Sequence, residues 1–153
     1  MTDLWLVRHG DAVPAEVDPE RPLSPAGADA VARAAAALAG RMGTFDLVAS
    51  SAKRRARQTA EIFGAAAGYP ADRIVETDAL GPDAPAEAFA DFLAASGAGG
   101  SALCVGHLPS LADFAAFFLA AGEPLRFEFG PGTVCRIRLR ALRRGGGELI
   151  LLF

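Results

Sequence analysis

The chain alternates short apolar runs with longer stretches of helical periodicity, and this alternation restricts the fold more than any other feature. Apolar runs at residues 3–7, 45–50, 73–77 and 102–106 predict strands. Helical stretches follow them, at 25–42, from Ser51 to about residue 67, at 86–96 and at 110–122. Strands alternating with helices predict an α/β fold, a three-layer α/β/α sandwich around a mostly parallel sheet. A length of 153 residues suits a single domain over residues 1–153.

Local signals mark the boundaries of several of these elements. Ser24 precedes Pro25, so we expect Ser24 to be the N-cap of the first helix, and Ser51 is expected to cap the second. Near the C-terminus, two strand-like runs at 133–142 and 148–153 flank a glycine-rich turn and predict a hairpin. Its alternating "CRIRLR" stretch indicates one buried and one solvated face.

Composition excludes several classes of function. The chain has 15 basic and 18 acidic residues, a net charge of −3, which argues against broad nucleic-acid binding. No stretch approaches the ~20 apolar residues of a membrane span, and the chain starts with a core strand rather than a signal peptide, so we expect a soluble cytoplasmic protein. Cys104 and Cys135 lie in apolar runs and are expected to be buried, inert thiols. Two scattered cysteines and two histidines also make a structural zinc site improbable.

Both histidines occupy the same kind of position. His9 follows the first predicted strand, and His107 follows "ALCVG" at 102–106. In open α/β sheets, ligands bind beyond the carboxyl ends of the strands. If these two strands are neighbours, both imidazoles converge on one edge of the sheet.

The stretch "SSAKRRARQT", residues 50–59, crowds positive charge onto the start of a helix. Cations there are unfavourable by a few tenths of a kcal/mol each, because the N-terminus of the helix dipole is already positive. A solvated basic face accounts for Lys53 and some of the arginines, whereas one inward arginine would help to bind an anion. We expect a pocket for a dianionic tetrahedral group, built by five side chains: Arg8, His9, Arg21, Arg55 and His107.

A neutral imidazole in such a pocket is a nucleophile near pH 7 without a metal ion. Attack on phosphorus would form a phosphohistidine intermediate, while arginines offset the charge on the equatorial oxygens. A cysteine-based phosphatase is excluded, because it needs an arginine six positions after the cysteine and Ser110 occupies that position after Cys104. The glycines at 97–100 precede a strand and are interpreted as a linker rather than a phosphate-binding loop.

Four segments resemble the histidine phosphatase superfamily, which is named for its RHG motif: "LVRHGDA", "RPLSPAG", "SSAKRRARQTA" and "CVGHLPSL". The match extends from residue 4 to about residue 115. The short length, "RHGDA", "RPLSPAG" and "HLP" are similar to the bacterial SixA-type phosphohistidine phosphatases. The resemblance implies a phosphoglycerate mutase-like fold without a metal or organic cofactor.

The resemblance also implies a role for each matching residue. His9 is the nucleophile that becomes phosphorylated. Gly10 permits close approach of the backbone and offers a carbonyl that orients His9. The phosphoryl group is bound by Arg8, Arg55 and His107, with a further contact from Arg21 on a mobile loop.

One departure from the family concerns the general acid. Larger members carry a glutamate after the third strand, but "ETDALGPDAPAE" offers no secure match. Asp83 is the nearest candidate acid, and Asp11 is another. The short chain leaves little room for a lid, which disfavours mutase activity on a sugar phosphate and suits a phosphate presented on a protein surface.

We therefore predict a phosphatase that hydrolyses phosphohistidine on a protein such as a phosphotransfer domain, through an intermediate on His9. One alternative is a phosphomonoesterase of the same superfamily that acts on a small phosphorylated metabolite. Another is a phosphate-binding module without turnover, although binding alone does not require the nucleophile. No metal, nucleic-acid partner or membrane partner is expected.

Overall fold

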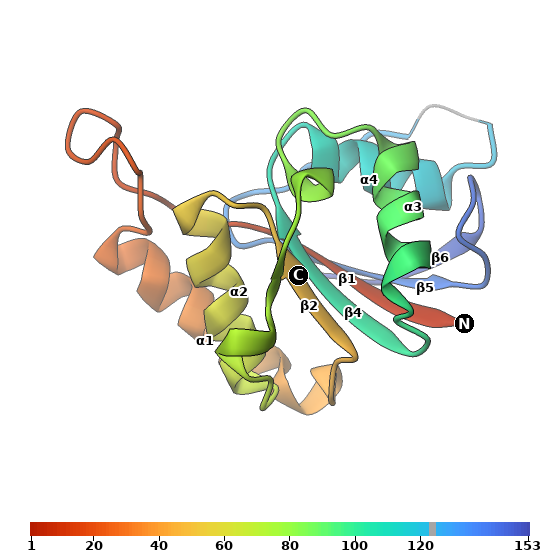
Figure 1. Cartoon of the computed structure of the whole chain (residues 1–153), viewed down its shortest axis with the longest axis horizontal. Helices are drawn as coiled ribbons and strands as arrows, with labels where there is room; N and C mark the ends of the chain where they lie inside the picture. The colour runs from red at the N-terminus through yellow and green to blue at the C-terminus, as the bar shows by residue number, and fades with distance from the viewer. Residues whose placement is uncertain (123–124) are drawn as a thin grey trace.

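A computed structural model describes residues 1–122 and 125–153 (Figure 1). Within this described part, six strands form one sheet in the order β3-β2-β4-β1-β5-β6. The strands are β1 (Thr2–Arg8), β2 (Leu47–Ser50), β3 (Val75–Glu76), β4 (Ser101–Gly106), β5 (Val134–Leu139) and β6 (Gly147–Leu152). The helices are α1 (Pro25–Met42), α2 (Arg54–Ala66), α3 (Ala86–Ser96) and α4 (Ser110–Leu119), with short 3₁₀ turns at Ala71–Arg73 and Asp78–Leu80.

The sheet is parallel in its core and antiparallel at one side. Strand β4 pairs in parallel with both β1 and β2, and β2 pairs in parallel with β3. The C-terminal hairpin adds β5 antiparallel to β1 and β6 antiparallel to β5. The predicted mostly parallel sheet with a closing hairpin is confirmed.

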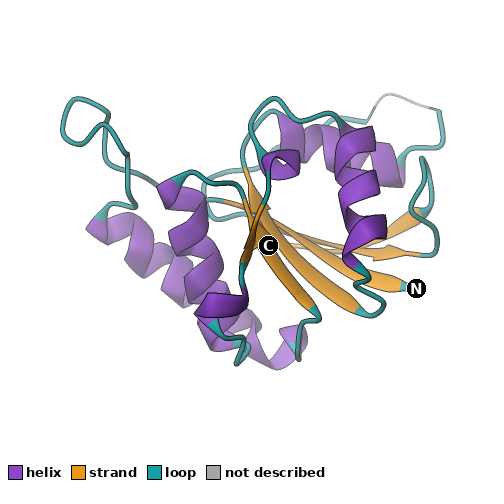
Figure 2. Cartoon of the chain, viewed as in Figure 1, coloured by secondary structure: helices purple, strands orange, loops and turns teal. Residues whose placement is uncertain are grey.

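Helices cover both faces of the sheet, as Figure 2 shows. Helices α1 and α2 cover one face and α3 and α4 the other, so alternate residues of β1 enter different cores. Trp5 and Val7 pack with residues of α1 and α2, whereas Leu4 and Leu6 pack with Phe89 of α3 and residues of α4. This arrangement confirms the three-layer α/β/α sandwich and explains why β1 is apolar at successive positions.

Several boundaries follow from local chemistry. Ser24 caps α1 as predicted, since its side chain accepts a hydrogen bond from the Gly27 N–H and Pro25 occupies the first turn. Cys104 and Cys135 are free and buried, as expected. No helix in the described residues is long and apolar enough to cross a membrane.

Other boundaries differ from the prediction. Ser51 does not cap α2: the helix begins at Arg54, with Lys53 at the N-cap position and no side-chain cap. The Ser51 side chain instead forms a hydrogen bond with His107, which is described below. Helix α4 ends at Leu119, before residue 122, and the strand predicted at 73–77 is paired only over Val75–Glu76.

Candidate active site

The two histidines lie together at the carboxyl end of the sheet. Strands β1 and β4 are neighbours, and their register pairs Arg8 with Gly106, so each strand delivers the histidine that follows it to the same edge. The centroids of the His9 and His107 rings are 4.9 Å apart, with 56° between the ring planes. The structure thus brings together the two imidazoles that the sequence placed at strand ends.

The His9 ring is oriented by the backbone of the next residue. Its Nδ1 lies 2.7 Å from the Gly10 carbonyl oxygen, which accepts only if Nδ1 carries the proton. The neutral ring therefore has its lone pair on Nε2. The N–H of Gly10 donates to Thr59 Oγ1 at 3.1 Å, which connects this turn to α2.

Helix α1 explains why residue 10 is a glycine. A Cβ atom at Gly10 would lie 2.5 Å from Cγ2 of Val31, closer than any ordinary contact. The absence of a side chain lets α1 pack directly against the turn that carries His9.

Arg55 reaches His9 from the first turn of α2. Its Nε lies 3.4 Å from Nε2 of His9 and points at the lone pair. Burial, and then the charge of Arg21, lower the pKa of Arg55 from its ordinary value. A cation held close to other cations at a helix N-terminus is an arrangement that a bound anion would stabilise.

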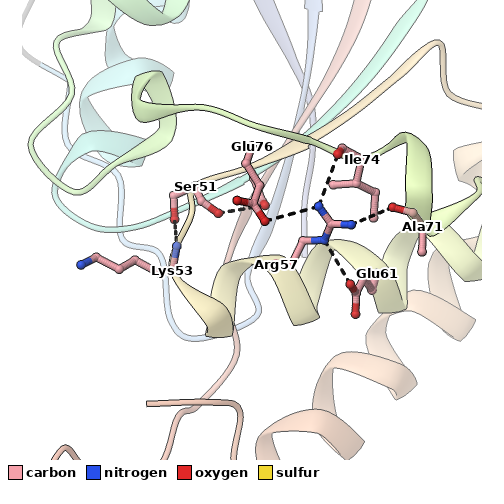
Figure 3. A network of polar contacts seen from close by, with 8 residues as sticks. Ser51, Lys53, Arg57, Glu61, Ala71, Ile74 and Glu76 are labelled. Carbon is pink, nitrogen blue, oxygen red and sulfur yellow. Dashed lines mark hydrogen bonds and ion pairs between the residues drawn. The ribbon is translucent and has the colours of Figure 1, made fainter. Parts of the chain in front are cut away.

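The neighbours of Arg55 point elsewhere. Arg57 donates to the Ala71 carbonyl at 2.8 Å and forms ion pairs with Glu61 at 3.0 Å and Glu76 at 3.4 Å (Figure 3). Arg54 pairs with Glu20 of the β1–α1 loop at 3.2 Å, with both side chains exposed. Arg55 thus differs from its neighbours in facing His9.

The other two predicted arginines come from the end of β1 and from the loop that follows it. Arg8 is anchored at Nη1 by the Phe129 carbonyl at 2.8 Å, and its Nε is enclosed without a partner in the described residues. Arg21 lies on the loop that projects between β1 and α1 (Figure 1), and its φ of 47° falls in the left-handed region that is unusual for a side-chain-bearing residue. Together with Arg55 and Lys53, Arg21 lines an open cavity of about 600 Å³.

Both histidines are held neutral. Burial lowers the pKa of His9 to about 4, assisted by Arg55, Arg8 and Arg21 and opposed by the hydrogen bond to Gly10. Burial also lowers the pKa of His107 to about 3, with smaller effects from His9 and the surrounding cations. The site therefore presents uncharged imidazoles inside a ring of fixed positive charge, an arrangement suited to an anionic electrophile.

The candidate acids lie outside this cluster. Asp83 and Asp11 are exposed, and in the described part of the chain no hydrogen bond joins a carboxylate to His9 or His107. Asp78 lines a neighbouring hollow with Ser51 and Lys53, and no hydrogen bond joins its carboxylate to either histidine. Nor do any three His, Cys, Asp or Glu side chains among the described residues gather as a metal site would require.

Sequence reasoning missed two hydroxyl groups in the site. Ser51 Oγ lies 2.6 Å from Nε2 of His107, and both residues are buried. Thr59 accepts from Gly10 and donates to the Arg55 carbonyl at 2.8 Å. The sequence around Ser51 indicates only a helix cap. No pattern in the neighbouring residues of Ser51 or Thr59 predicts these hydrogen bonds.

Comparison with known proteins places this geometry in a family. A model of the histidine phosphatase superfamily (branch 1) matches residues 4–80. The structure of the protein histidine phosphatase SixA complexed with tungstate is 27% identical; the alignment covers 99% of this chain and 96% of that chain, with a TM-score of 0.83. A protein assigned as the phosphohistidine phosphatase SixA of Nakamurella multipartitia is also 27% identical, with 99% and 95% covered and a TM-score of 0.80.

A more distant match shows the fold alone. The mycobacterial glucosyl-3-phosphoglycerate phosphatase is 18% identical, with 97% of each chain covered and a TM-score of 0.74. The comparison with curated proteins found no significant match. The sandwich described above is the phosphoglycerate mutase-like fold, and the chain belongs to the histidine phosphatase superfamily.

Proposed function

We propose that this protein is a phosphohistidine phosphatase, with one domain over residues 1–153 and His9 as its nucleophile. The observation that carries the proposal is the state of the His9 ring. Its Nδ1–H is held by the Gly10 carbonyl, so Nε2 keeps a lone pair directed toward Arg55. Phosphoryl transfer requires a nucleophile that is held in its reactive tautomer and lies beside an arginine.

The reaction then proceeds in two displacements. In the first, Nε2 of His9 attacks phosphorus and the P–N bond of the substrate breaks. The substrate imidazole, which already carries a proton on its other ring nitrogen, takes the electron pair of that bond and departs neutral. In the second, water attacks the phosphoryl group on His9, releases orthophosphate and returns the electron pair of the P–N bond to Nε2. The Gly10 carbonyl keeps the Nδ1 proton in place throughout.

Fixed cations and hydrogen-bond donors would stabilise the transferring group. Arg8, Arg55 and His107 lie around His9 and would bind the equatorial oxygens, with Arg21 adding a contact from its loop. These groups carry out the charge neutralisation that metal ions perform in other phosphatases, and we propose that no metal is needed.

No carboxylate of the described residues is hydrogen-bonded to either histidine, and this favours a nitrogen leaving group. Imidazole has a conjugate acid of pKa near ~6.5 and can leave without an enzyme acid. An alkoxide resembles hydroxide, whose conjugate acid has a pKa of about 15.7, so cleavage of an ester needs a proton donor. Asp83 and Asp11 are exposed, and neither forms a hydrogen bond with His9 or His107. The similarity to SixA proteins supports the same substrate class, a phosphohistidine on a protein such as a phosphotransfer domain.

Trapping the intermediate tests the mechanism. Rapid quenching with ³²P-labelled phosphohistidine protein is expected to give an acid-labile, alkali-stable adduct on His9, absent in His9→Ala. An adduct on another residue, or full activity of His9→Ala, would exclude His9 as the nucleophile.

A substrate panel tests the leaving-group argument. Phosphohistidine is expected to be hydrolysed about 10²–10⁴-fold faster than alkyl phosphates, the usual contribution of general acid catalysis. If the wild type prefers alkyl esters, the protein is a phosphomonoesterase for small metabolites instead.

A further inference from the structure

Ser51 occupies a position that its expected role as a helix cap does not explain. It follows β2 and is only 2% exposed, and its Oγ lies 2.6 Å from Nε2 of His107, which is 3% exposed. The sheet order β2-β4-β1 places His107, which follows β4, between Ser51 and His9. Ser51 therefore binds the Nε2 edge of the His107 ring on the β2 side, and the His9 ring lies on the β1 side.

The direction of the Ser51–His107 hydrogen bond follows from counting protons. The backbone N–H of Lys53 donates to Ser51 Oγ at 3.3 Å, as Figure 3 shows. The hydroxyl has one proton of its own, and Nε2 of His107 is its acceptor in the described part of the chain. If His107 donated instead, the Ser51 proton would be buried without a partner, which is costly. Ser51 therefore donates, and Nε2 of His107 carries a lone pair.

A neutral His107 ring that accepts at Nε2 must carry its proton on Nδ1. Nδ1 has no hydrogen-bond partner among the described residues, and it is not one of their enclosed, unsatisfied polar atoms, so it remains accessible. The centroid of the His107 ring lies 4.9 Å from the centroid of the His9 ring.

We propose that Ser51 is a positioning residue that fixes His107 in its Nδ1–H tautomer, so that this N–H donates to the phosphoryl group on His9. Both histidines then share one tautomer but present opposite functions. His9 is held at Nδ1 by Gly10 and offers a lone pair, whereas His107 is held at Nε2 by Ser51 and offers a proton. The role of this proton in catalysis rests on the proposed function, whereas the tautomer itself does not.

Nitrogen NMR tests the tautomer directly, because the chain has only two histidines. Long-range ¹H–¹⁵N correlation spectra at pH 7 are expected to show both rings as Nδ1–H tautomers, with His107→Gln providing the assignment. In Ser51→Ala, the His107 signals are expected to move toward the Nε2–H form that free histidine prefers, while His9 stays unchanged. Ser51→Thr, which keeps the donor, is expected to retain the wild-type pattern.

The matched control is Ser50→Ala. Ser50 is equally buried, but its hydroxyl donates to the Ser51 carbonyl at 2.9 Å rather than to a histidine, so both tautomers are expected to persist. A wild-type His107 in the Nε2–H form would overturn the proposal, even if Ser51→Ala failed to fold. An unchanged His107 signal in folded Ser51→Ala would overturn it as well.

Kinetics test the consequence separately. Ser51→Ala is expected to lower kcat for a phosphohistidine substrate about tenfold, and Ser51→Thr to restore most of it. A wild-type protein without phosphatase activity would refute the proposed function while the NMR result still decided the tautomer. A confirmed tautomer with unchanged kcat in Ser51→Ala would refute the catalytic role of Ser51 alone.

Discussion

The neutral histidines make the stability of this protein depend on pH in a calculable way. His9 and His107 have folded-state pKa values of about 4 and about 3, against an ordinary value of 6.5. Between these limits the unfolded chain binds protons that the folded protein does not. The free energy of unfolding must therefore fall as pH drops below about 6.5, and this effect levels off only below the folded values.

The size of the loss follows from the distance between pH and the unfolded pKa. At pH 5 the unfolded histidines are almost fully protonated and the folded ones are neutral, so each ring costs at most ~2 kcal/mol relative to pH 7.5. His107 is almost fully enclosed and should show most of this cost. His9 is half-buried, and solvent screening reduces its share to about 1 kcal/mol. We expect the wild type to lose about 3 kcal/mol through the two rings.

Urea denaturation followed by circular dichroism at pH 7.5, 6.5, 5.5 and 5.0 measures this loss, and His107→Gln is the informative comparison. The variant has no ring to protonate but keeps all the carboxylates, so their titration cancels in the difference. His107→Gln is expected to lose about 2 kcal/mol less than the wild type between pH 7.5 and 5. Equal losses in the two proteins would show that His107 is not held neutral by burial, and the argument would fail.

Three further outcomes are expected at the site. Arg55→Ala should cost about 2–4 kcal/mol of transition-state stabilisation in kcat/KM, because it removes the preorganised cation beside His9. Arg54→Ala and Arg57→Ala, whose side chains bind Glu20 and the α2–β3 region, should cost much less, and equal effects from all three would indicate a diffuse basic surface. Activity should survive exhaustive EDTA treatment, and a large loss restored by Mg²⁺ or Mn²⁺ would contradict the metal-free mechanism. Asp83→Asn should change phosphohistidine hydrolysis by less than about tenfold, whereas abolished turnover would identify Asp83 as an essential acid.

The fold was accessible from sequence because its signals are local. Alternating apolar runs and helical periodicity predicted the layers, and Ser24 with Pro25 marked the start of α1 correctly. The same kind of signal was wrong at Ser51, where a serine before a helix looks like a cap. The Ser51 side chain bonds to His107 instead of capping the helix. His107 lies 56 positions further along the chain, so no local sequence pattern predicts this hydrogen bond.

The sequence by itself determined which residues end the core strands, and it predicted that His9 and His107 meet at one edge of the sheet if their strands are neighbours. It also determined the chemistry available there, because imidazole and guanidinium groups are present whatever the packing. The sequence also predicted Arg55 as the inward arginine, but only the tertiary structure shows that Arg54 and Arg57 face elsewhere, since this depends on how α2 is rotated against the sheet. The tertiary structure alone also brought Ser51 to His107, because β2 and β4 are neighbours through long-range pairing that no nearby residue specifies.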